Sequence, residues 1–214
     1  MLFTKLINMK RIILIAIAIT IITATFSSCK KDYEKIKIQK HDENAMMDIM
    51  HHMMMEMDMM SPTNDPDHDF AMMMKMHHQG AIHMAEQELK EGENDDMKKI
   101  AQKIKDEQQA EIAQFDSFLA GHTPDTAVQE YTMKVMSAMA TMTRTADLQV
   151  ITGEADYDFA SLMIPHHQSA IEMAQAVKEH GKHQEIKDMA VKIIDFQKKE
   201  IEELQNWLLN NKEY

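Results

Sequence analysis

The clearest pattern in the chain is a stripe of core-type positions spaced alternately four and three residues apart, and it occurs twice. The first stripe comprises Met97, Ala101, Ile104, Gln108, Glu111, Phe115 and Phe118. The second comprises Ile186, Ala190, Ile193, Gln197, Glu200, Leu204 and Trp207. This spacing keeps side chains on one face of an α-helix, so both segments are predicted to be helices that pack in a bundle.

The two stripes belong to a longer internal repeat. Asp69 aligns with Asp158, an offset of 89 residues, and the alignment brings His-His-Gln at 77–79 onto His-His-Gln at 166–168. The match extends backwards, where methionines at 47, 50 and 53 align with methionines at 136, 139 and 142. A repeat of this length indicates a duplicated architecture.

Each repeat predicts three helices. They cover about 44–60, 67–91 and 94–120 in the first repeat, and about 126–149, 156–180 and 183–210 in the second. Asp65 and Pro66 are a typical helix start, and Gly92 and Gly181 are expected to end helices and allow tight hairpins. With five glycines and four prolines in 214 residues, the expected fold class is all-α. Two duplicated hairpins would form a ferritin-like four-helix bundle, with additional methionine-rich helices.

Residues 1–28 have the pattern of a lipoprotein signal peptide. Three basic residues precede an apolar run at 12–22, which is too short for a stable membrane span, and small residues follow it. A short membrane anchor is the alternative. Residues 29–42 are expected to form a charged tether, and residues 43–214 a duplicated helical domain with repeats at 43–121 and 126–210.

The only cysteine, Cys29, directly follows two serines. This context resembles a bacterial lipobox, although Phe26 stands where leucine is usual, and it predicts that Cys29 is acylated after cleavage. Lys30 follows in place of an aspartate, which by the same resemblance favours the outer membrane. The expected location is therefore exported and membrane-anchored, at the periplasmic face or the outer membrane.

The charge of the chain limits its partners. The formal net charge is −12, and removal of the signal peptide with its three basic residues takes it to about −15. Such an acidic surface disfavours nucleic acid and attracts cations. Because the sole cysteine is expected to be acylated, a site for soft metals would have to be built without thiolate.

A candidate site emerges where polar residues interrupt both stripes. Gln108 and Glu111, and likewise Gln197 and Glu200, stand at core positions, where a polar side chain is costly unless it has a partner. If each hairpin turns at its glycine, the His-His pair of the preceding helix lies level with them. These four residues are expected to orient the histidines.

Methionines share the helical face of the first histidine of each pair, at steps of three and seven. Thioether sulfur suits Cu(I) and Ag(I), and imidazole accepts either copper oxidation state. The candidate metal ligands are Met74, His77, His78, Met84, Met163, His166, His167 and Met173. The alternative is that these are structural histidines hydrogen-bonded within the core, among methionines that only fill space.

The methionine content is a second observation. The chain has 24 methionines, and nine of them lie between residues 46 and 60. On a helix they would place sulfur on every side, which packing on one face does not require. An accessory cation-loading surface is expected there, from Met47, Met50, His51, His52 and Met53; a flexible packing or interaction helix is the alternative.

Residues 163–174, Met-Ile-Pro-His-His-Gln-Ser-Ala-Ile-Glu-Met-Ala, resemble the hallmark of domain-of-unknown-function family 305. The resemblance covers about 44–210 and implies a ferritin-like bundle and extracytoplasmic copper handling, as in exported copper-binding proteins of the CopM type. It implies ligand roles for His166, His167, Met163 and Met173 and their counterparts. The first repeat departs from the pattern, with Lys-Met at 75–76 and histidine at 83, so its selectivity is less defined.

The function expected from these features is binding of Cu(I), and also Ag(I), for sequestration, resistance or metallochaperone transfer, without a catalysed reaction. A copper exporter or another copper-handling protein would be its partner. One alternative is a ferritin-like di-metal carboxylate oxidase, but that chemistry uses Glu-x-x-His motifs, which the chain lacks. The other is a structural or interaction protein, which metal analysis would distinguish.

Overall fold

The computed structural model describes residues 38–211, and all regular structure in that range is helical. The elements are η1 (His41–Glu43), α2 (Ala45–Asp58), α3 (Pro66–Glu91), α4 (Asp95–Gly121), α5 (Gln129–Asp147), α6 (Ala155–His180) and α7 (Gln184–Asn210). The prediction of an all-α fold is confirmed, and each of the six predicted helices is present with bounds within three residues of those expected. The signal segment and Cys29 lie outside the described residues.

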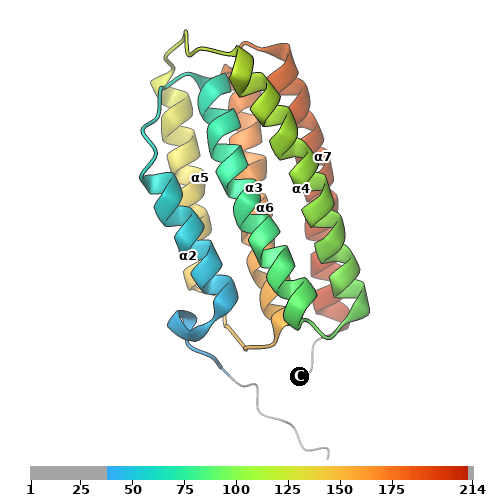
Figure 1. Cartoon of the computed structure of the whole chain (residues 1–214). Coiled ribbons are helices and arrows are strands. Elements are labelled where there is room, and N and C mark those ends of the chain that lie inside the picture. The colour runs from blue at the N-terminus through green and yellow to red at the C-terminus, as the bar shows by residue number, and fades with distance from the viewer. Residues whose placement is uncertain (1–37, 212–214) are drawn as a thin grey trace, which may run out of the picture. The chain divides into compact units, whose positions relative to one another are not determined.

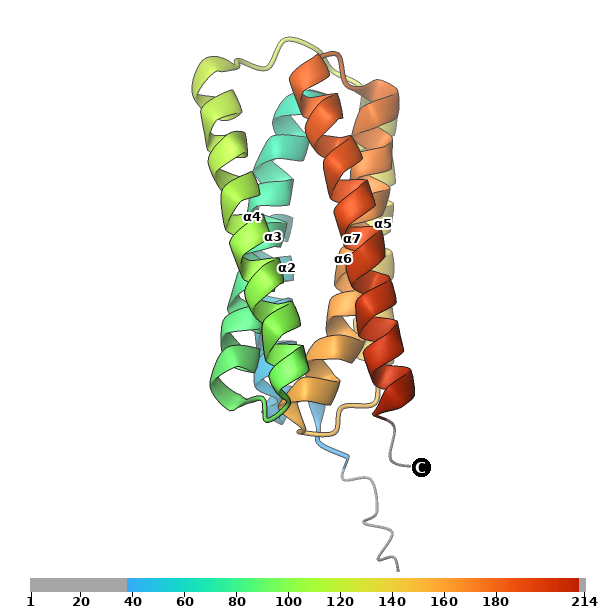
Figure 2. The ribbon, with the colours of Figure 1, turned by 90° about the vertical axis from the view of Figure 1, so that its right-hand side faces the viewer.

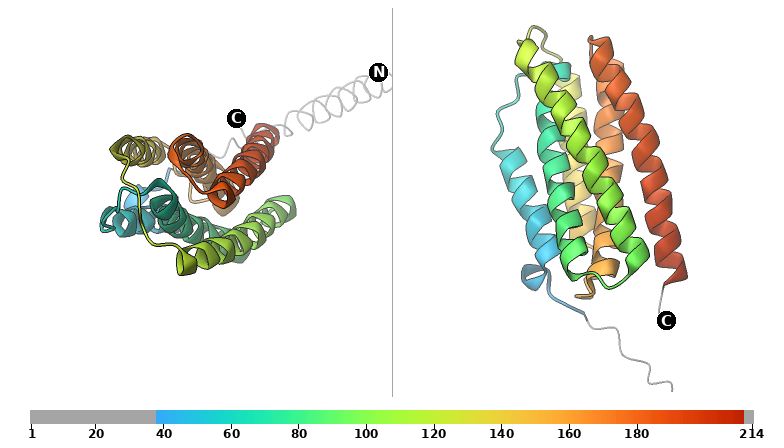
Figure 3. Two further views of the ribbon diagram at one scale, coloured as in Figure 1. Left: turned by 90° about the horizontal axis from the view of Figure 1, so that it is seen from above. Right: turned by 45° about the vertical axis from the view of Figure 1, so that its right-hand side comes forward.

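The six α-helices form two layers. Helices α2, α3 and α4 lie in one layer and α5, α6 and α7 in the other, as the view from above shows (Figure 3, left). The central helices α3 and α6 pack against each other, while the methionine-rich helices α2 and α5 pack on their outer sides (Figure 1). The hairpins α3–α4 and α6–α7 lie side by side (Figure 2). The two repeats therefore face each other about a pseudo-twofold axis between α3 and α6.

Carboxylates of each repeat cap the hairpin of the other. Asp67 Oδ2, in the first turn of α3, accepts a hydrogen bond from the Lys182 amide at 2.7 Å. Asp156, its counterpart in α6, accepts from the amides of Glu93 and Asn94, each at 3.0 Å. The same capping interaction thus occurs twice at the repeat offset, and it joins the two repeats at both ends of the bundle.

The hairpin glycines are required for a reason that the sequence did not indicate. Gly92 and Gly181 follow α3 and α6 with φ of −61° and −69°, so neither is in the left-handed conformation common at helix ends. A Cβ atom at Gly92 would lie 2.7 Å from the carbonyl oxygen of Glu88, and one at Gly181 would lie 2.7 Å from that of Val177. Close backbone packing, rather than positive φ, therefore explains both glycines.

The folded part begins before the expected boundary at residue 43. The Gln39 amide donates to the Ile151 carbonyl at 2.8 Å, and His41 Nε2 lies 2.9 Å from the Gln149 carbonyl oxygen. The last residues of the expected tether thus pack on the loop between α5 and α6. Among the described helices, none combines the length and the apolar character needed to cross a membrane.

Candidate functional site

The centre of the molecule contains a pair of histidines in close ring-to-ring contact. His77 of α3 and His166 of α6 are equivalent residues of the two repeats, and both side chains are fully buried. Their ring centroids are 3.7 Å apart, with 38° between the ring planes. Equivalent residues can touch in this way only at the pseudo-twofold axis, so we call them the axial histidines.

Both axial rings are neutral. Burial lowers the pKa of His77 well below its usual value, and the neighbouring His166 lowers it further. Burial also lowers the pKa of His166 well below its usual value, with His167 as the next cause. An imidazole without its second proton keeps a lone pair on one ring nitrogen, which is the form that binds metals.

The surroundings of the axial pair break the symmetry of the repeats. His77 Nε2 lies 2.8 Å from the Ser169 hydroxyl oxygen, and that hydroxyl is also 3.1 Å from Met142 Sδ. The position equivalent to Ser169 is Gly80, where the Met53 sulfur takes the space that a Cβ would fill. His166, by contrast, has no hydrogen-bond partner on either ring nitrogen among the described residues. Sequence reasoning missed Ser169 and Met142; the single Gly-to-Ser difference beside the two His-His-Gln motifs was the available signal.

The second histidine of each pair points to its own hairpin. His78 Nε2 lies 2.8 Å from Glu111 Oε2, and His167 Nε2 lies 3.0 Å from Glu200 Oε2. These are the glutamates that the helical register placed beside them. In both pairs the angles at the contact are poor for a hydrogen bond, and the other ring nitrogen of each histidine, Nδ1, has no hydrogen-bond partner among the described residues.

Glu107 of α4 interacts with Glu200 of the His167–Glu200 pair in the second repeat. Burial raises the pKa of Glu107 to about 7, and a hydrogen bond with Glu200 contributes to this rise. Burial alone would raise the pKa of Glu200 as well, but its interactions with His167 outweigh that effect and lower it. Glu200 is therefore the ionised carboxylate, and near neutral pH the proton that the two carboxyl groups share resides on Glu107.

Buried polar atoms without partners are concentrated here. Of the seventeen buried side-chain nitrogen and oxygen atoms without a hydrogen-bond partner in the described range, twelve belong to seven central residues. These residues are His77, His78, Gln108, His166, His167, Gln197 and Glu200. Two of the twelve, His78 Nε2 and His167 Nε2, still lie within 3.0 Å of a carboxylate oxygen. An atom without such a neighbour costs about 1–3 kcal/mol, and native proteins contain few of them. The imidazole nitrogens and amide oxygens among them fit a group that accepts lone pairs.

The eight predicted ligands are all buried in α3 and α6, including the methionines at 74, 84, 163 and 173. The structure does not group them as one site per repeat. The rings of His77 and His78 are 6.3 Å apart and those of His166 and His167 are 6.0 Å apart, whereas the axial rings of different repeats are in contact. The geometry therefore points to one shared centre flanked by two His–Glu pairs.

The five residues expected to form an accessory surface differ in exposure. Met47, Met50 and Met53 face the core, with exposed fractions of 0–3%, because α2 packs on α3 with this side. His51 and His52 are exposed; His51 pairs with Asp147 at 2.9 Å, and His52 lies 3.7 Å from Glu56. The methionines of α2 lie mainly on its buried side, but Met55, at 54% exposure, and Met59, directly after α2 at 71%, present sulfur to solvent.

Two cavities lie beside the central helices, and one of them brings other thioethers together. One, of about 450 Å³, lies between α2, α3 and α5, and six of its lining residues are Met54, Met57, Met60, Met73, Met136 and Met139. The buried hydroxyl of Tyr131, which also lines it, has no hydrogen-bond partner among the described residues. The other, of about 330 Å³, lies between α5, α6 and α7 and is lined in part by Met142, Pro165 and Ser169.

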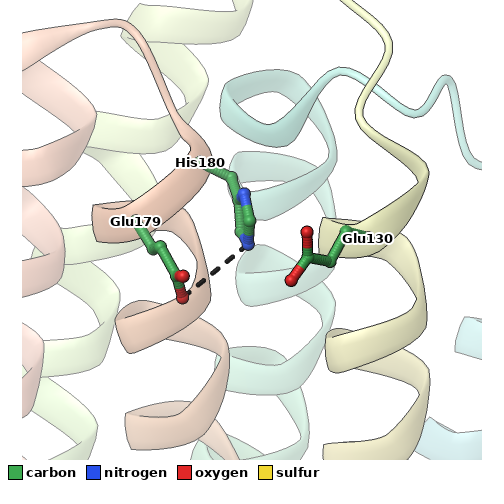
Figure 4. Close-up of side chains that lie close together, drawn as sticks. All are labelled: Glu130, Glu179 and His180. Carbon is green, nitrogen blue, oxygen red and sulfur yellow. Dashed lines mark ion pairs between the residues drawn. The ribbon is translucent and has the colours of Figure 1, made fainter.

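One cluster of carboxylates and histidine stands apart from these features. Among the described residues, Glu130, Glu179 and His180 form the one set of three His, Asp or Glu ligand atoms within 4.8 Å of one another (Figure 4). The ammonium of Lys134 lies 2.6 Å from Glu179 Oε2 and 3.1 Å from His180 Nε2, and it also pairs with Glu130. The cluster is therefore a surface ion-pair network that already contains its cation.

Comparison with known protein families agrees with the duplicated helical unit. The profile of the domain of unknown function DUF305 matches the chain twice, over residues 23–119 and 67–208. The chain belongs to the DUF305 family. The second match spans α3 to α7 and therefore includes both His-His-Gln motifs and both axial histidines of this DUF305 protein.

A solved structure supports the fold of this DUF305 chain. The crystal structure of a DUF305 fragment from Deinococcus radiodurans matches with a TM-score of 0.52 and 23% sequence identity, covering 70% of this chain and 99% of that one. At this identity the similarity concerns the fold alone. The comparison with curated proteins gave no match.

Proposed function

We propose that this DUF305 protein binds soft monovalent metal ions, Cu(I) and also Ag(I), at the axial histidines. The observation that carries the proposal is the concentration of unpartnered buried nitrogen and oxygen atoms around two neutral imidazoles in contact. A bound cation would give the imidazole lone pairs a partner and would offset the cost of burying them. Sequestration, resistance or transfer of copper to another protein would follow from such a site.

The donor set explains the preference for soft ions. His77 and His166 would supply imidazole nitrogen, and Met142, which contacts Ser169 beside them, would supply thioether sulfur. Thioether favours Cu(I) and Ag(I) over hard cations, and two neutral histidines add no negative charge that would attract Mg²⁺ or Ca²⁺. His78 and His167 would remain on their glutamates as flanking donors.

The cavity between α5, α6 and α7 suggests a route to this centre. Its lining includes Ser169 and Met142, and the Ser169 hydroxyl contacts His77 Nε2. An ion that enters there would meet a thioether first and the axial imidazoles next. The methionine-lined cavity between α2, α3 and α5 would take the accessory loading role, with the half-buried Met54 and Met60 in place of the buried side of α2.

The finer fold assignment is part of the same proposal. Helices α3, α4, α6 and α7 would constitute a ferritin-like four-helix bundle of the CopM type, since two antiparallel hairpins are joined by a long connection that contains α5. Helices α2 and α5 would then be additions to this bundle.

The location is proposed on the sequence alone. Cys29 would be acylated after cleavage behind Ser28 and would hold the protein at the periplasmic face of a membrane or at the outer membrane. Replacing Cys29 with Ala should move the protein from the membrane fraction to the soluble fraction. Unchanged membrane association of this variant would contradict the assignment.

Thermal unfolding tests the binding proposal. A ligand that binds the folded chain alone stabilises it by about 2.7 kcal/mol at a hundredfold excess over its dissociation constant. We expect Cu(I), under reducing conditions, to raise the melting temperature of the full chain more than Zn(II) does. Cys29 is replaced by Ser in every sample so that its thiol does not contribute.

The variant in which His77, His78, His166 and His167 are all replaced with Gln is the specificity control. It should lose most of the Cu(I) response but should keep its helical circular dichroism. Equal stabilisation by Zn(II) and Cu(I), or a wild-type Cu(I) response in the folded variant, would contradict the proposed centre.

A further inference from the structure

Ser169 of α6 stands between two of the donors that the proposed metal centre uses. Its hydroxyl oxygen lies 2.8 Å from His77 Nε2 and 3.1 Å from Met142 Sδ. The same oxygen lies 2.7 Å from the backbone carbonyl oxygen of His166, three residues earlier in the helix. The Ser169 side chain is 2% exposed, so bulk water has little access to these contacts. One small polar group therefore contacts an imidazole, a thioether and a carbonyl at once.

The hydrogen of the Ser169 hydroxyl can be donated to only one of these neighbours at a time. If the hydroxyl donates to the His166 carbonyl or to the sulfur, its oxygen can only accept from His77, whose Nε2 then carries the proton. If it donates to His77 instead, the lone pair of Nε2 is already engaged. In each case His77 Nε2 has no free lone pair for a metal ion while the hydroxyl is in this position.

A metal ion held by both His77 Nε2 and Met142 Sδ needs the space that this hydroxyl occupies. The hydroxyl oxygen is within hydrogen-bonding distance of both donor atoms, and an ion bonded to both would lie closer still to each of them. The two nitrogens of an imidazole point in divergent directions, so Nδ1 of His77 cannot replace Nε2 beside Met142. Binding by this pair of donors therefore requires the hydroxyl to leave.

The first repeat shows the other half of the centre without a hydroxyl. Gly80 occupies the position equivalent to Ser169, and Met53 Sδ lies where a Cβ would be. His166, the equivalent of His77, has no hydrogen-bond partner on either ring nitrogen in the part of the chain that the structure describes. Helix packing at this position thus does without a hydroxyl, and Ser169 makes the two halves of the centre unequal.

The cavity between α5, α6 and α7 gives the hydroxyl room to move. Its volume is about 330 Å³, and Ser169 is one of its lining residues. Rotation about the Cα–Cβ bond takes a serine oxygen from one staggered position to another without moving the helix backbone. Such a rotation can carry the hydroxyl from between His77 and Met142 towards the cavity.

We propose that Ser169 is a positioning residue that regulates the axial centre: its hydroxyl holds His77 Nε2 while no metal is bound, and an ion gains His77 and Met142 only when the hydroxyl turns away. This role rests on the proposed function, since it concerns how readily the same centre takes up and releases Cu(I). Because the hydroxyl must give up its contacts, the centre binds more weakly than the same donors would without it. A site weakened in this way suits transfer of copper rather than permanent storage.

Cu(I) affinity, measured by competition with a coloured Cu(I) chelator under anaerobic reducing conditions, tests this role. The full chain is used, with Cys29 replaced by Ser throughout. Ser169→Ala should bind Cu(I) about three- to tenfold more tightly than the wild type, which corresponds to one net hydrogen bond. Ser161→Ala is the matched control, because Ser161 of the same helix bonds to the Asp158 carbonyl at 3.2 Å and makes no hydrogen bond to a described imidazole. It should bind Cu(I) like the wild type.

Nitrogen-15 NMR of the histidine side chains in the metal-free chain tests the contact itself. The His77 Nε2 resonance should shift in Ser169→Ala and stay unchanged in Ser161→Ala, because only the first variant loses the hydroxyl bonded to this nitrogen. Ser169→Gly, which carries the residue of the first repeat, should give the same two results as Ser169→Ala. Circular dichroism of each variant checks that the helices are intact.

The variant with His77 and His166 both replaced by Gln separates the two possible failures. If it binds Cu(I) as tightly as the wild type, or if the wild type binds no Cu(I), the proposed function fails and the regulation by Ser169 fails with it. If only the wild type binds through these rings, but neither Ser169 variant binds more tightly than it, the role of Ser169 alone is overturned. A His77 resonance that does not respond to loss of the hydroxyl also overturns it.

Discussion

Acidification should destabilise the metal-free protein through the axial histidines. Burial holds the pKa of His77 and His166 well below 6.5 in the folded chain, whereas both rings titrate near 6.5 once the chain is unfolded. The unfolded chain therefore binds more protons than the folded chain as the pH falls through 6.5. The stability that the neutral pair contributes is present above this pH and is lost below it.

The size of the effect follows from the number of rings. If both rings stay neutral in the folded chain, lowering the pH from 7.0 to 5.5 costs about 2.5 kcal/mol of unfolding free energy for the pair. Glu88 and Glu107 act in the opposite direction, because their pKa values are raised to about 8 and about 7. The prediction therefore concerns the difference between the wild type and a variant with both axial histidines replaced by Gln, in which the carboxyl contributions cancel.

Urea unfolding followed by circular dichroism at pH 7.0 and 5.5, with a chelator present, measures this difference. The wild type should lose about 2.5 kcal/mol more than the double variant between these pH values. His83→Gln, at an exposed position of the same helix, is the control and should leave the pH dependence unchanged. Parallel losses in the wild type and the double variant would refute the neutral, buried state of the axial pair.

Three further predictions concern stability and use chemical denaturation. Glu88, whose pKa burial raises to about 8, should make the wild type lose stability relative to Glu88→Gln as the pH rises from 5 to 8, by at most about 1.4 kcal/mol per pH unit. Asp67→Ala and Asp156→Ala should each cost about 1–3 kcal/mol, since each leaves amides of the opposite hairpin without their acceptor. Met163→Ala should cost about 2–5 kcal/mol at a fully buried position, whereas Met59→Ala, at a position 71% exposed, should change stability by less than about 0.5 kcal/mol.

The helices and hairpins could be predicted because their signals are local. The stripes that contain Gln108 and Glu111, and Gln197 and Glu200, fix the buried faces of α4 and α7, and the hairpin register places each glutamate beside its histidine. The exposure of α2 was misjudged because composition does not show which neighbour covers a helix. Five of its methionines are buried by packing against other helices.

The contact between the rings of His77 and His166 could not be predicted from either repeat alone. It depends on how α3 and α6 pack, and no pattern within one hairpin determines that contact. The asymmetry of Gly80 and Ser169 acquires a meaning only once both residues are seen next to the axial rings.

X-ray absorption spectroscopy of the Cu(I)-loaded full chain, with Cys29 replaced by Ser, tests the central claim most directly. The proposed axial centre predicts a copper ion bound by both imidazole nitrogen and thioether sulfur. Replacing His77 and His166 with Gln should remove the imidazole contribution, while methionine-bound copper elsewhere can remain. A spectrum without imidazole scattering in the wild type, or one that is the same in the folded double variant, would contradict copper binding at the axial histidines.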